Sequence, residues 1–260
     1  ISACLVGSEM CIRDRLHGAF IVDKNNDKIR LGNNKSDWAA VMAKGGLGAI
    51  PFAGSFLAEV VSTLIPNQRL DRLVKYATEL NDRLERMPVE LMDQLRNNEQ
   101  FIDMVEESFI RVSRASSEER RQYILSIVWH GMSNDKAAIN NAKYILGLLS
   151  ELNDNEVIWL RYFHERTLHD KGQFQALHKN ILAPVQVMIG SSKEEKQKGA
   201  IQESYKEHLE RLGLIKSHIK MNKDLGVPEY NTFTNKPEIT YSEATTLGNM
   251  LLENIGLIED

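Results

Sequence analysis

The chain has 260 residues, 42% of them hydrophobic, which is enough apolar material for one large or two modest globular domains. Its net charge of −4 excludes binding to nucleic acid or anionic lipid that is driven by bulk charge. Six prolines, a low aromatic share and long runs of Leu, Glu, Lys and Arg favour helices over sheets.

The first 15 residues do not read as native protein. Ten consecutive residues, Leu5 to Asp14, resemble the in-frame translation of a transposase adapter used in DNA sequencing, and Arg15 fits the bases that follow it. A signal peptide is the rival interpretation, but the apolar stretch before Glu9 is too short for one. We therefore exclude residues 1–15 from fold prediction as an adapter artefact.

Both cysteines, Cys4 and Cys11, lie in this adapter-like segment. We therefore expect no disulfide, thiol nucleophile or cysteine-bound metal in the authentic protein, which fits a reducing cytoplasm. The chain starts at Ile1, and the first methionine beyond the segment is Met42. We expect that the reading frame ran off the end of an assembled fragment and that the native start is missing.

Residues 16–35 follow, and their apolar positions alternate weakly around Asn25 and Asn26. This pattern indicates either a small hairpin or non-coding DNA read through into protein. Residues 36–152 are then predicted to form a helical domain.

The most unusual stretch of this domain is the Gly-rich apolar segment 45–66. Small residues let helices approach closely, so we interpret the segment as a buried helical hairpin, with insertion at a membrane surface as the alternative. Its 14 uncharged residues before Glu59 are too few for a simple membrane span, which needs about 20. The candidate contacts with a membrane or partner are Phe52, Phe56, Leu57, Val60 and Leu64.

Apolar residues then recur at alternating spacings of three and four from Leu70 to Met87, a stripe typical of a coiled coil. Pro88 interrupts the stripe, and a single further helix is predicted to continue to residue 112. We expect the two helices to pack as a pair and predict that 67–112 mediates self-association or contact with a protein partner.

Three helix N-terminal signals in series indicate a bundle of short amphipathic helices. Two are capping boxes, in which a polar side chain and a glutamate three residues later bond each other's backbone N–H groups. The third is an aspartate that precedes an apolar-periodic run. The signals are Ser116 with Glu119, opening a helix through His130; Asp135, opening a helix to Leu152; and Asn153 with Glu156, opening Val157–Leu168.

Residues 153–260 change character and resemble a winged-helix domain. The fold class predicted for the chain is therefore an all-α helical bundle with a C-terminal winged-helix-like domain containing a small β-wing. The expected elements are a helix over 174–189, a polar linker over 191–199, a helix over 201–212, a strand within LGLIKSHIKM, a loop rich in Asn, Pro and Gly, a strand over 238–241 and a helix over 242–255.

This resemblance makes a DNA-binding regulator the alternative function. The outward face of helix 201–212 would be net negative, which opposes contact with phosphates, whereas the wing is more basic. We therefore favour a structural or protein-binding role and expect no nucleic-acid partner. The candidate nucleic-acid contacts under the alternative are Lys206, Lys216, Lys220 and Lys223.

The sequence carries no recognisable catalytic motif. His164 and His169 are five residues apart, about 140° round a helix, whereas a zinc-protease pair needs a spacing of four. The glycines of 45–66 lack the phosphate-loop pattern, and no nucleophile elbow or nucleotide fingerprint occurs. We expect a non-enzymatic protein without cofactor or metal.

Three phrases carry a family resemblance over residues 116–256: SEERRQYILSIVWHGMSND, ILGLLSELNDNEVIWLRYF and the LERLGLI-to-TTLG end. Together with the apolar Gly-rich segment they resemble bacterial Abi-alpha-type proteins, a group associated with abortive phage infection. The resemblance implies a cytoplasmic helical protein of phage defence, peripheral to the inner membrane or acting on a protein partner. It brings no motif from which site residues can be transferred.

Overall fold

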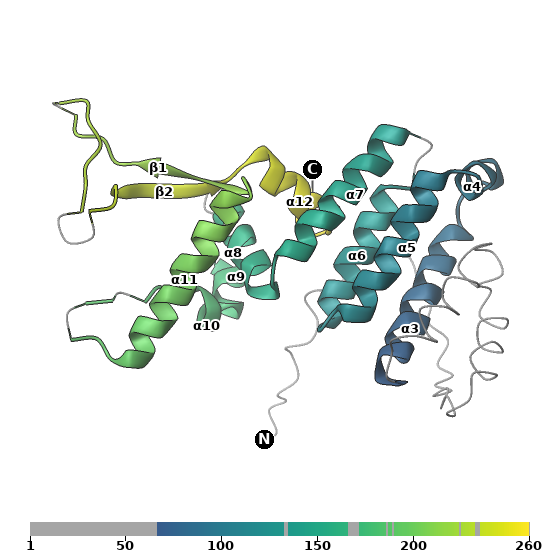
Figure 1. Ribbon diagram of the computed structural model, residues 1–260, viewed down its shortest axis with the longest axis horizontal. Helices are drawn as coiled ribbons and strands as arrows, with labels where there is room; N and C mark the ends of the chain where they lie inside the picture. The colour runs from purple at the N-terminus through teal and green to yellow at the C-terminus, as the bar shows by residue number, and fades with distance from the viewer. Residues whose placement is uncertain are drawn as a thin grey trace, which may run out of the picture. The chain divides into compact units, whose positions relative to one another are not determined.

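The computed structural model describes residues 67–132, 135–165, 172–185, 187–188, 190–223, 225–231 and 235–259. Within these ranges the chain is mostly helical, with ten helices and one two-stranded antiparallel sheet near the C-terminus (Figure 1). All of them fall in one compact unit, Ala39–Asp260. The predictions on residues 1–66, including the adapter-like segment and the contacts Phe52, Phe56, Leu57, Val60 and Leu64, lie outside the described residues.

The first described helices are α3 (Asn67–Leu84), α4 (Val89–Arg96) and α5 (Glu99–Arg114). The prediction of one continuous helix after Pro88 is wrong, because the side chain of Asn98 accepts hydrogen bonds from the backbone N–H groups of Gln100 and Phe101. This cap starts α5 as a separate helix.

The predicted stripe of α3 packs inside the chain against α5 and α6. The ring of Tyr76 meets that of Phe109 edge-on, with centroids 5.1 Å apart, and its hydroxyl donates to Ser108 Oγ at 2.8 Å. Burial raises the pKa of Tyr76 well above its ordinary value. The buried side chains of the stripe are Leu73, Tyr76, Ala77, Leu80 and Leu84.

Helices α6 (Glu118–His130), α7 (Lys136–Glu151) and α8 (Asp154–Glu165) follow the three predicted cap signals. Two caps are confirmed: Asp135 accepts from the N–H of Ala137, and Asn153 and Glu156 form the reciprocal box, with bonds of 3.0 and 2.8 Å. The remaining cap, which was predicted at Ser116, is displaced by one residue. The side chain of Ser117, not Ser116, accepts from the N–H of Arg120.

Helices α9 (Gly172–Leu177), α10 (Lys179–Leu182) and α11 (Lys193–Arg211) correct two predictions. The single helix expected over 174–189 is two short helices. The linker expected over 191–199 is wrong, because Ser192 and Glu195 form a capping box that starts α11 eight residues before the predicted helix.

Strand β1 (Ile215–Ile219) pairs with β2 (Ile239–Ala244), with Ile215 opposite Ala244 and a bulge between His218 and Ile219. The two predicted strands are confirmed, but the last helix does not begin at Ser242. That residue pairs with Ser217 in the sheet, and α12 (Thr246–Asn254) starts after Thr245, whose side chain accepts from the N–H of Gly248.

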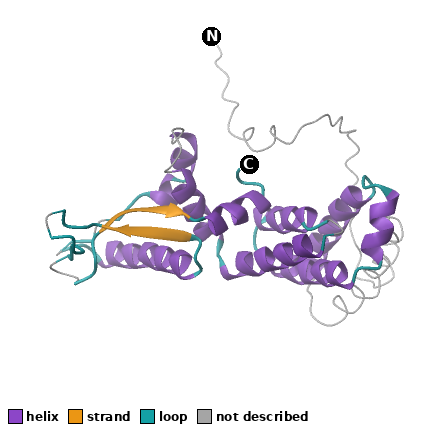
Figure 2. Ribbon diagram, turned by 90° about the horizontal axis from the view of Figure 1, so that it is seen from above, coloured by secondary structure: helices purple, strands orange, loops and turns teal. Residues whose placement is uncertain are grey.

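Helix α12 joins the sheet to the rest of the unit, because it packs on α6, α7 and α8, and Leu251 and Leu252 are fully buried. Its first turn presses on the start of β1: a Cβ added at Gly248 would lie 2.2 Å from the carbonyl oxygen of Leu214. The base of the sheet is therefore anchored, while the two strands run beside α11 (Figure 2).

Candidate functional site

Two surfaces of the described chain stand out, and the first is the β arm, defined as residues 215–244. Beyond its two strands the arm folds into two small loops, closed by the bridges Met221–Pro228 and Tyr230–Pro237. Three backbone hydrogen bonds link its centre in a ring, from Lys220 to Glu238, from Glu229 to Lys220 and from Glu238 to Glu229. The arm is therefore a folded element rather than an open loop.

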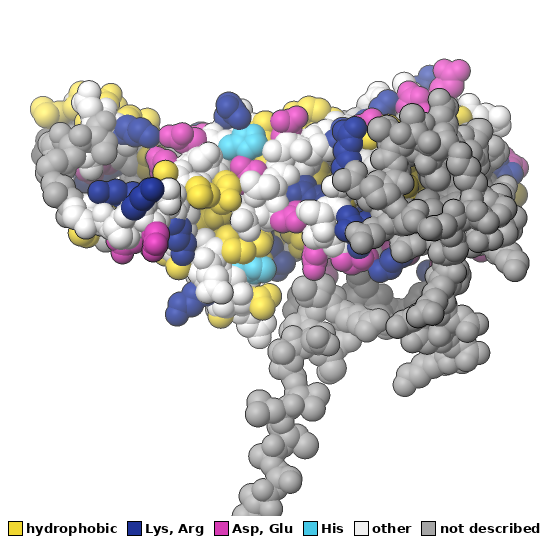
Figure 3. Space-filling view, turned by 60° about the horizontal axis from the view of Figure 1, so that its bottom comes forward, with side chains coloured by type: hydrophobic (Ala, Val, Ile, Leu, Met, Phe, Trp, Pro, Cys, Tyr) yellow, Lys and Arg dark blue, Asp and Glu magenta, His cyan; other side chains and the backbone are white. Residues whose placement is uncertain are grey.

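The β arm exposes an unusual amount of apolar surface. Seven of the fourteen exposed large hydrophobic side chains of the described residues lie within 219–241. Leu225 is 74% exposed and Tyr230 is 55% exposed. Figure 3 shows hydrophobic side chains at the left, among basic and acidic groups, and further hydrophobic groups in the middle of this face. We call the seven residues the arm patch: Ile219, Met221, Leu225, Val227, Tyr230, Ile239 and Tyr241.

Several charged groups of the β arm pair with one another. The ammonium of Lys220 lies 2.7 Å from a carboxylate oxygen of Glu229 and 3.0 Å from one of Glu238, and these hydrogen bonds raise the pKa of Lys220. His218 Nε2 lies 2.7 Å from Glu243 Oε1, and its ring stacks on Tyr241. Residues 215–244 carry four Lys and four Asp or Glu in all, so the β arm is formally neutral.

The four lysines predicted as nucleic-acid contacts do not form one cluster. Lys206 lies on α11, Lys216 and Lys220 lie on or next to β1, and Lys223 lies in the first loop of the β arm. Only Lys220 among them is held between two carboxylates. Close by, Lys236 contacts Glu207 and Glu203 at 3.0 and 3.5 Å, so acidic side chains of α11 flank this part of the arm.

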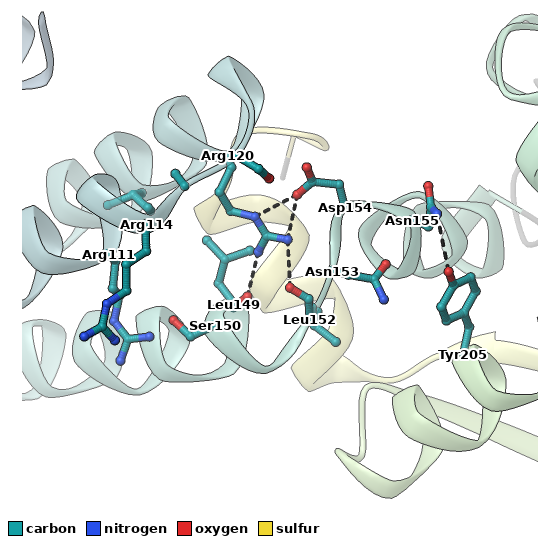
Figure 4. A pocket seen from close by; sticks show the side chains of 13 residues that line it. Arg111, Arg114, Arg120, Leu149, Ser150, Leu152, Asn153, Asp154, Asn155 and Tyr205 are labelled. Atoms are coloured by element: carbon teal, nitrogen blue, oxygen red, sulfur yellow. Dashed lines mark hydrogen bonds and ion pairs between the residues drawn. The ribbon is translucent and has the colours of Figure 1, made fainter. Parts of the chain in front are cut away.

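The second surface is the arginine groove, a cavity of about 700 Å³ between the end of α5, the junction of α7 with α8, and α11. Figure 4 shows Arg111 and Arg114 side by side at one end of it, Arg120 in the middle, and Asn155 with Tyr205 at the other end. The polar groups that line it are Arg111, Arg114, Ser116, Arg120, Ser150, Asn153, Asp154, Asn155 and Tyr205.

Arg120 is the structural centre of the arginine groove. Its guanidinium donates to Asp154 Oδ1 and to the carbonyl oxygens of Leu149 and Leu152, at distances between 2.7 and 2.8 Å. Ser117 Oγ donates to the other carboxylate oxygen of Asp154 at 2.9 Å. These contacts tie α6 to the turn between α7 and α8 and satisfy carbonyls at the end of α7.

The histidines considered as metal ligands contact protein groups. His164 Nδ1 lies 2.9 Å from Asn249 Oδ1, and His169 lies outside the described residues. In the part of the chain that the structure describes, no three His, Cys, Asp or Glu side chains are grouped so that they could hold a metal ion. No helix among the described residues is both long and apolar enough to cross a membrane.

The sequence predicted neither the arm patch nor the arginine groove. The sequence predicted a loop in the region of the β arm. The apolar residues Ile219, Met221 and Val227 in and beside it were the signal for an exposed apolar surface, but their exposure depends on how the arm packs. The arginine groove gathers residues from 111 to 205 that share no local pattern. Comparisons of this chain with protein-family models, with curated proteins and with solved structures found no match.

Proposed function

We propose that the protein is a non-enzymatic interaction protein that self-associates through the β arm. The observation that carries this proposal is the concentration of half of the exposed large hydrophobic side chains of the described residues in 219–241. A contiguous apolar surface with a polar rim marks a protein interaction site, whereas single exposed apolar residues need no explanation.

The occupant that best fits the arm patch is a second copy of this chain. The four Lys and four Asp or Glu residues of the β arm give it a formal net charge of zero, so two arms do not repel each other through net charge. In a dimer with two-fold symmetry, each copy contributes the same patch to the interface. An apolar surface without net charge is complementary to a second surface of the same kind. The apolar stripe of α3, for which the sequence predicted self-association, is buried within the chain, so it is not accessible to a second copy.

Sedimentation velocity on the full chain tests this proposal. The wild type is expected to form a dimer with a concentration-dependent dissociation constant, and the double variant Leu225→Ser, Tyr230→Ser is expected to be monomeric. Both side chains are exposed on loops of the β arm, so their replacement leaves the core intact.

A matched control is the double variant Val89→Ser, Leu177→Ser, because these two residues are each 71% exposed and lie on α4 and α9. The control is expected to dimerise like the wild type. A monomeric wild type at all concentrations, or an arm variant that dimerises as the wild type does, would overturn the proposal. Equal loss of the dimer in the control variant would also overturn the proposal, because it would show that any loss of exposed apolar surface prevents dimerisation.

A winged-helix DNA-binding regulator is the second candidate, supported by the order α8, α9, α10, α11, β1, β2, α12. The acidic flank of α11 and the carboxylates that hold Lys220 and Lys236 weigh against it. Fluorescence anisotropy with a labelled duplex at two salt concentrations separates the candidates. Tight binding with a steep salt dependence, weakened by Lys216→Ala, would favour the regulator.

The resemblance of residues 116–256 to abortive-infection proteins supports a role in phage defence for the assembled protein. Plating efficiency of phage on bacteria that express the chain tests this role. The wild type and the Val89→Ser, Leu177→Ser control are expected to reduce plaque formation, and the arm variant is expected to lose that effect. Equal plating on all strains would contradict it.

A further inference from the structure

The arginine groove is separate from the β arm and has the size of a small-molecule site. Its volume of about 700 Å³ lies within the range of about 300–1,000 Å³ that is usual for pockets that bind small ligands. Apolar side chains of Ile124, Leu149 and Leu152 line it together with amides and hydroxyls. A cavity of this kind can hold a ligand with both a polar and an apolar part.

The only carboxylate in the lining of the groove is already neutralised. Asp154 accepts from Arg120 through one oxygen and from Ser117 through the other. The charge of Arg120 is paired with Asp154, and its guanidinium also binds the carbonyl oxygens of Leu149 and Leu152. The remaining charges of the lining are therefore those of Arg111 and Arg114.

These two arginines lack the partners that Arg120 has. Arg114 is exposed and forms no hydrogen bond or ion pair with any described residue. Arg111 pairs with Glu107 through Nη2 at 2.5 Å, but its Nε is buried and has no hydrogen-bond partner among the described residues. Arg114 therefore offers the groove a guanidinium that has no acceptor among the described residues.

Arg111 and Arg114 also lie on one face of α5, because residues three apart on a helix are neighbours. Figure 4 shows both side chains running in the same direction to the same end of the groove. Glu107 offsets the charge of Arg111, so an anion placed between the two guanidinium groups would chiefly neutralise Arg114 while also accepting hydrogen bonds from Arg111.

We propose that the arginine groove binds a phosphate-bearing small molecule, with Arg111 and Arg114 holding the phosphate. A phosphate monoester is an anion with three strong acceptor oxygens, so it can accept hydrogen bonds from both guanidinium groups at once. Asn153, Asn155 and Tyr205, at the other end of the groove, offer neutral donors and acceptors to the rest of the ligand.

Isothermal titration calorimetry at constant ionic strength tests this site with three probes: pyrophosphate, ATP and adenosine. The full chain is expected to bind ATP more tightly than pyrophosphate and to show no binding of adenosine alone. The variant Arg114→Ala is expected to weaken ATP binding by about tenfold, the loss expected for one charge-assisted contact. Its thermal unfolding is expected to match that of the wild type, because the Arg114 side chain is exposed and forms no hydrogen bond or ion pair with any described residue.

The matched control is Arg211→Ala, which removes the same charge from the exposed last turn of α11, outside the lining of the groove. It is expected to bind ATP within about twofold of the wild type. The proposal is overturned by a wild type that binds neither phosphate probe at about 10 mM. It is equally overturned by an Arg114→Ala variant with unchanged affinity, or by a control that loses as much affinity as that variant.

Discussion

Arg120 donates a hydrogen bond from Nε to Asp154 Oδ1 at 2.8 Å, and its Nη2 forms an ion pair with the same oxygen at 2.7 Å. The Arg120 side chain is only 12% exposed, and it also holds two carbonyl oxygens at the end of α7. The pair thus joins three helices at the point where the first described helices meet the C-terminal half of the unit.

Replacement of Arg120 by alanine is expected to lower the free energy of unfolding by about 2–4 kcal/mol. The change removes an ion pair and the hydrogen bonds to the carbonyls of Leu149 and Leu152, together with the packing of a side chain that is only 12% exposed. Urea denaturation measures the effect. Arg114→Ala serves as the control and is expected to change stability by less than about 0.5 kcal/mol. Similar losses in the two variants would contradict the clamp role of Arg120.

The buried hydrogen bond from Tyr76 to Ser108 predicts an asymmetry between two variants. Tyr76→Phe removes the donor and is expected to cost about 1 kcal/mol, because the hydroxyl of Ser108 still donates to the carbonyl of Val105 at 2.6 Å. Ser108→Ala leaves the phenolic hydroxyl buried without an acceptor and is expected to cost about 2 kcal/mol. Equal costs, measured by urea denaturation, would show that Tyr76 finds another acceptor.

Two glycines in helices are expected to respond to alanine in opposite ways. Gly248→Ala places a Cβ 2.2 Å from the Leu214 carbonyl oxygen and is expected to cost about 3 kcal/mol, because backbone on both sides would have to move. Gly147 lies within α7 and has no atom within 4 Å of an added Cβ. Gly147→Ala is expected to gain about 0.5–1 kcal/mol through helix propensity. Thermal unfolding of both variants checks the pair, and a stable Gly248→Ala protein would refute the close contact.

The lowered pKa of Glu118 predicts that the folded protein loses stability in acid. Burial raises its pKa, but hydrogen bonds from Lys75, Arg121 and Gln122 outweigh this effect and hold the pKa at about 2, below the ordinary value of 4.5. A depressed carboxyl pKa stabilises the folded state above the unfolded pKa, and that stability is lost as pH falls from about 4.5 to about 2. The side chain is 40% exposed, so solvent screening keeps the effect modest.

The variant Glu118→Gln is therefore expected to be less stable than the wild type at pH 7 and to approach it as the pH falls towards 2. Urea denaturation across this range measures the difference. A difference that is constant with pH would show that the carboxylate charge contributes nothing.

Capping residues next to a helix start predicted the position of two helices correctly. Asp135, Asn153 and Glu156 cap their helices as expected, because capping depends on residues within one turn. Ser192 and Glu195 carry the same signal, but the polar run around them was interpreted as a linker, so the first turns of α11 were missed. The break at Asn98 was not predicted, because the step of seven residues from Leu95 to Ile102 is also compatible with one continuous helix.

Features that depend on distant contacts could not be predicted from the sequence. Ser242 belongs to β2 because it pairs with Ser217, although its neighbours suit a helix start. The exposure of the arm patch and the lining of the arginine groove depend on the packing of elements far apart in the chain. Composition did indicate a mostly helical chain, as found in the described residues.

The most direct test of self-association through the β arm is hydrogen exchange of the full chain, measured by mass spectrometry at about 1 µM and about 100 µM, on either side of a micromolar dissociation constant. Backbone amides of 219–241 are expected to gain protection at the higher concentration, while those of α4 remain unchanged. Exchange in the β arm that does not depend on concentration would contradict the account, as would protection gained only in other parts of the chain.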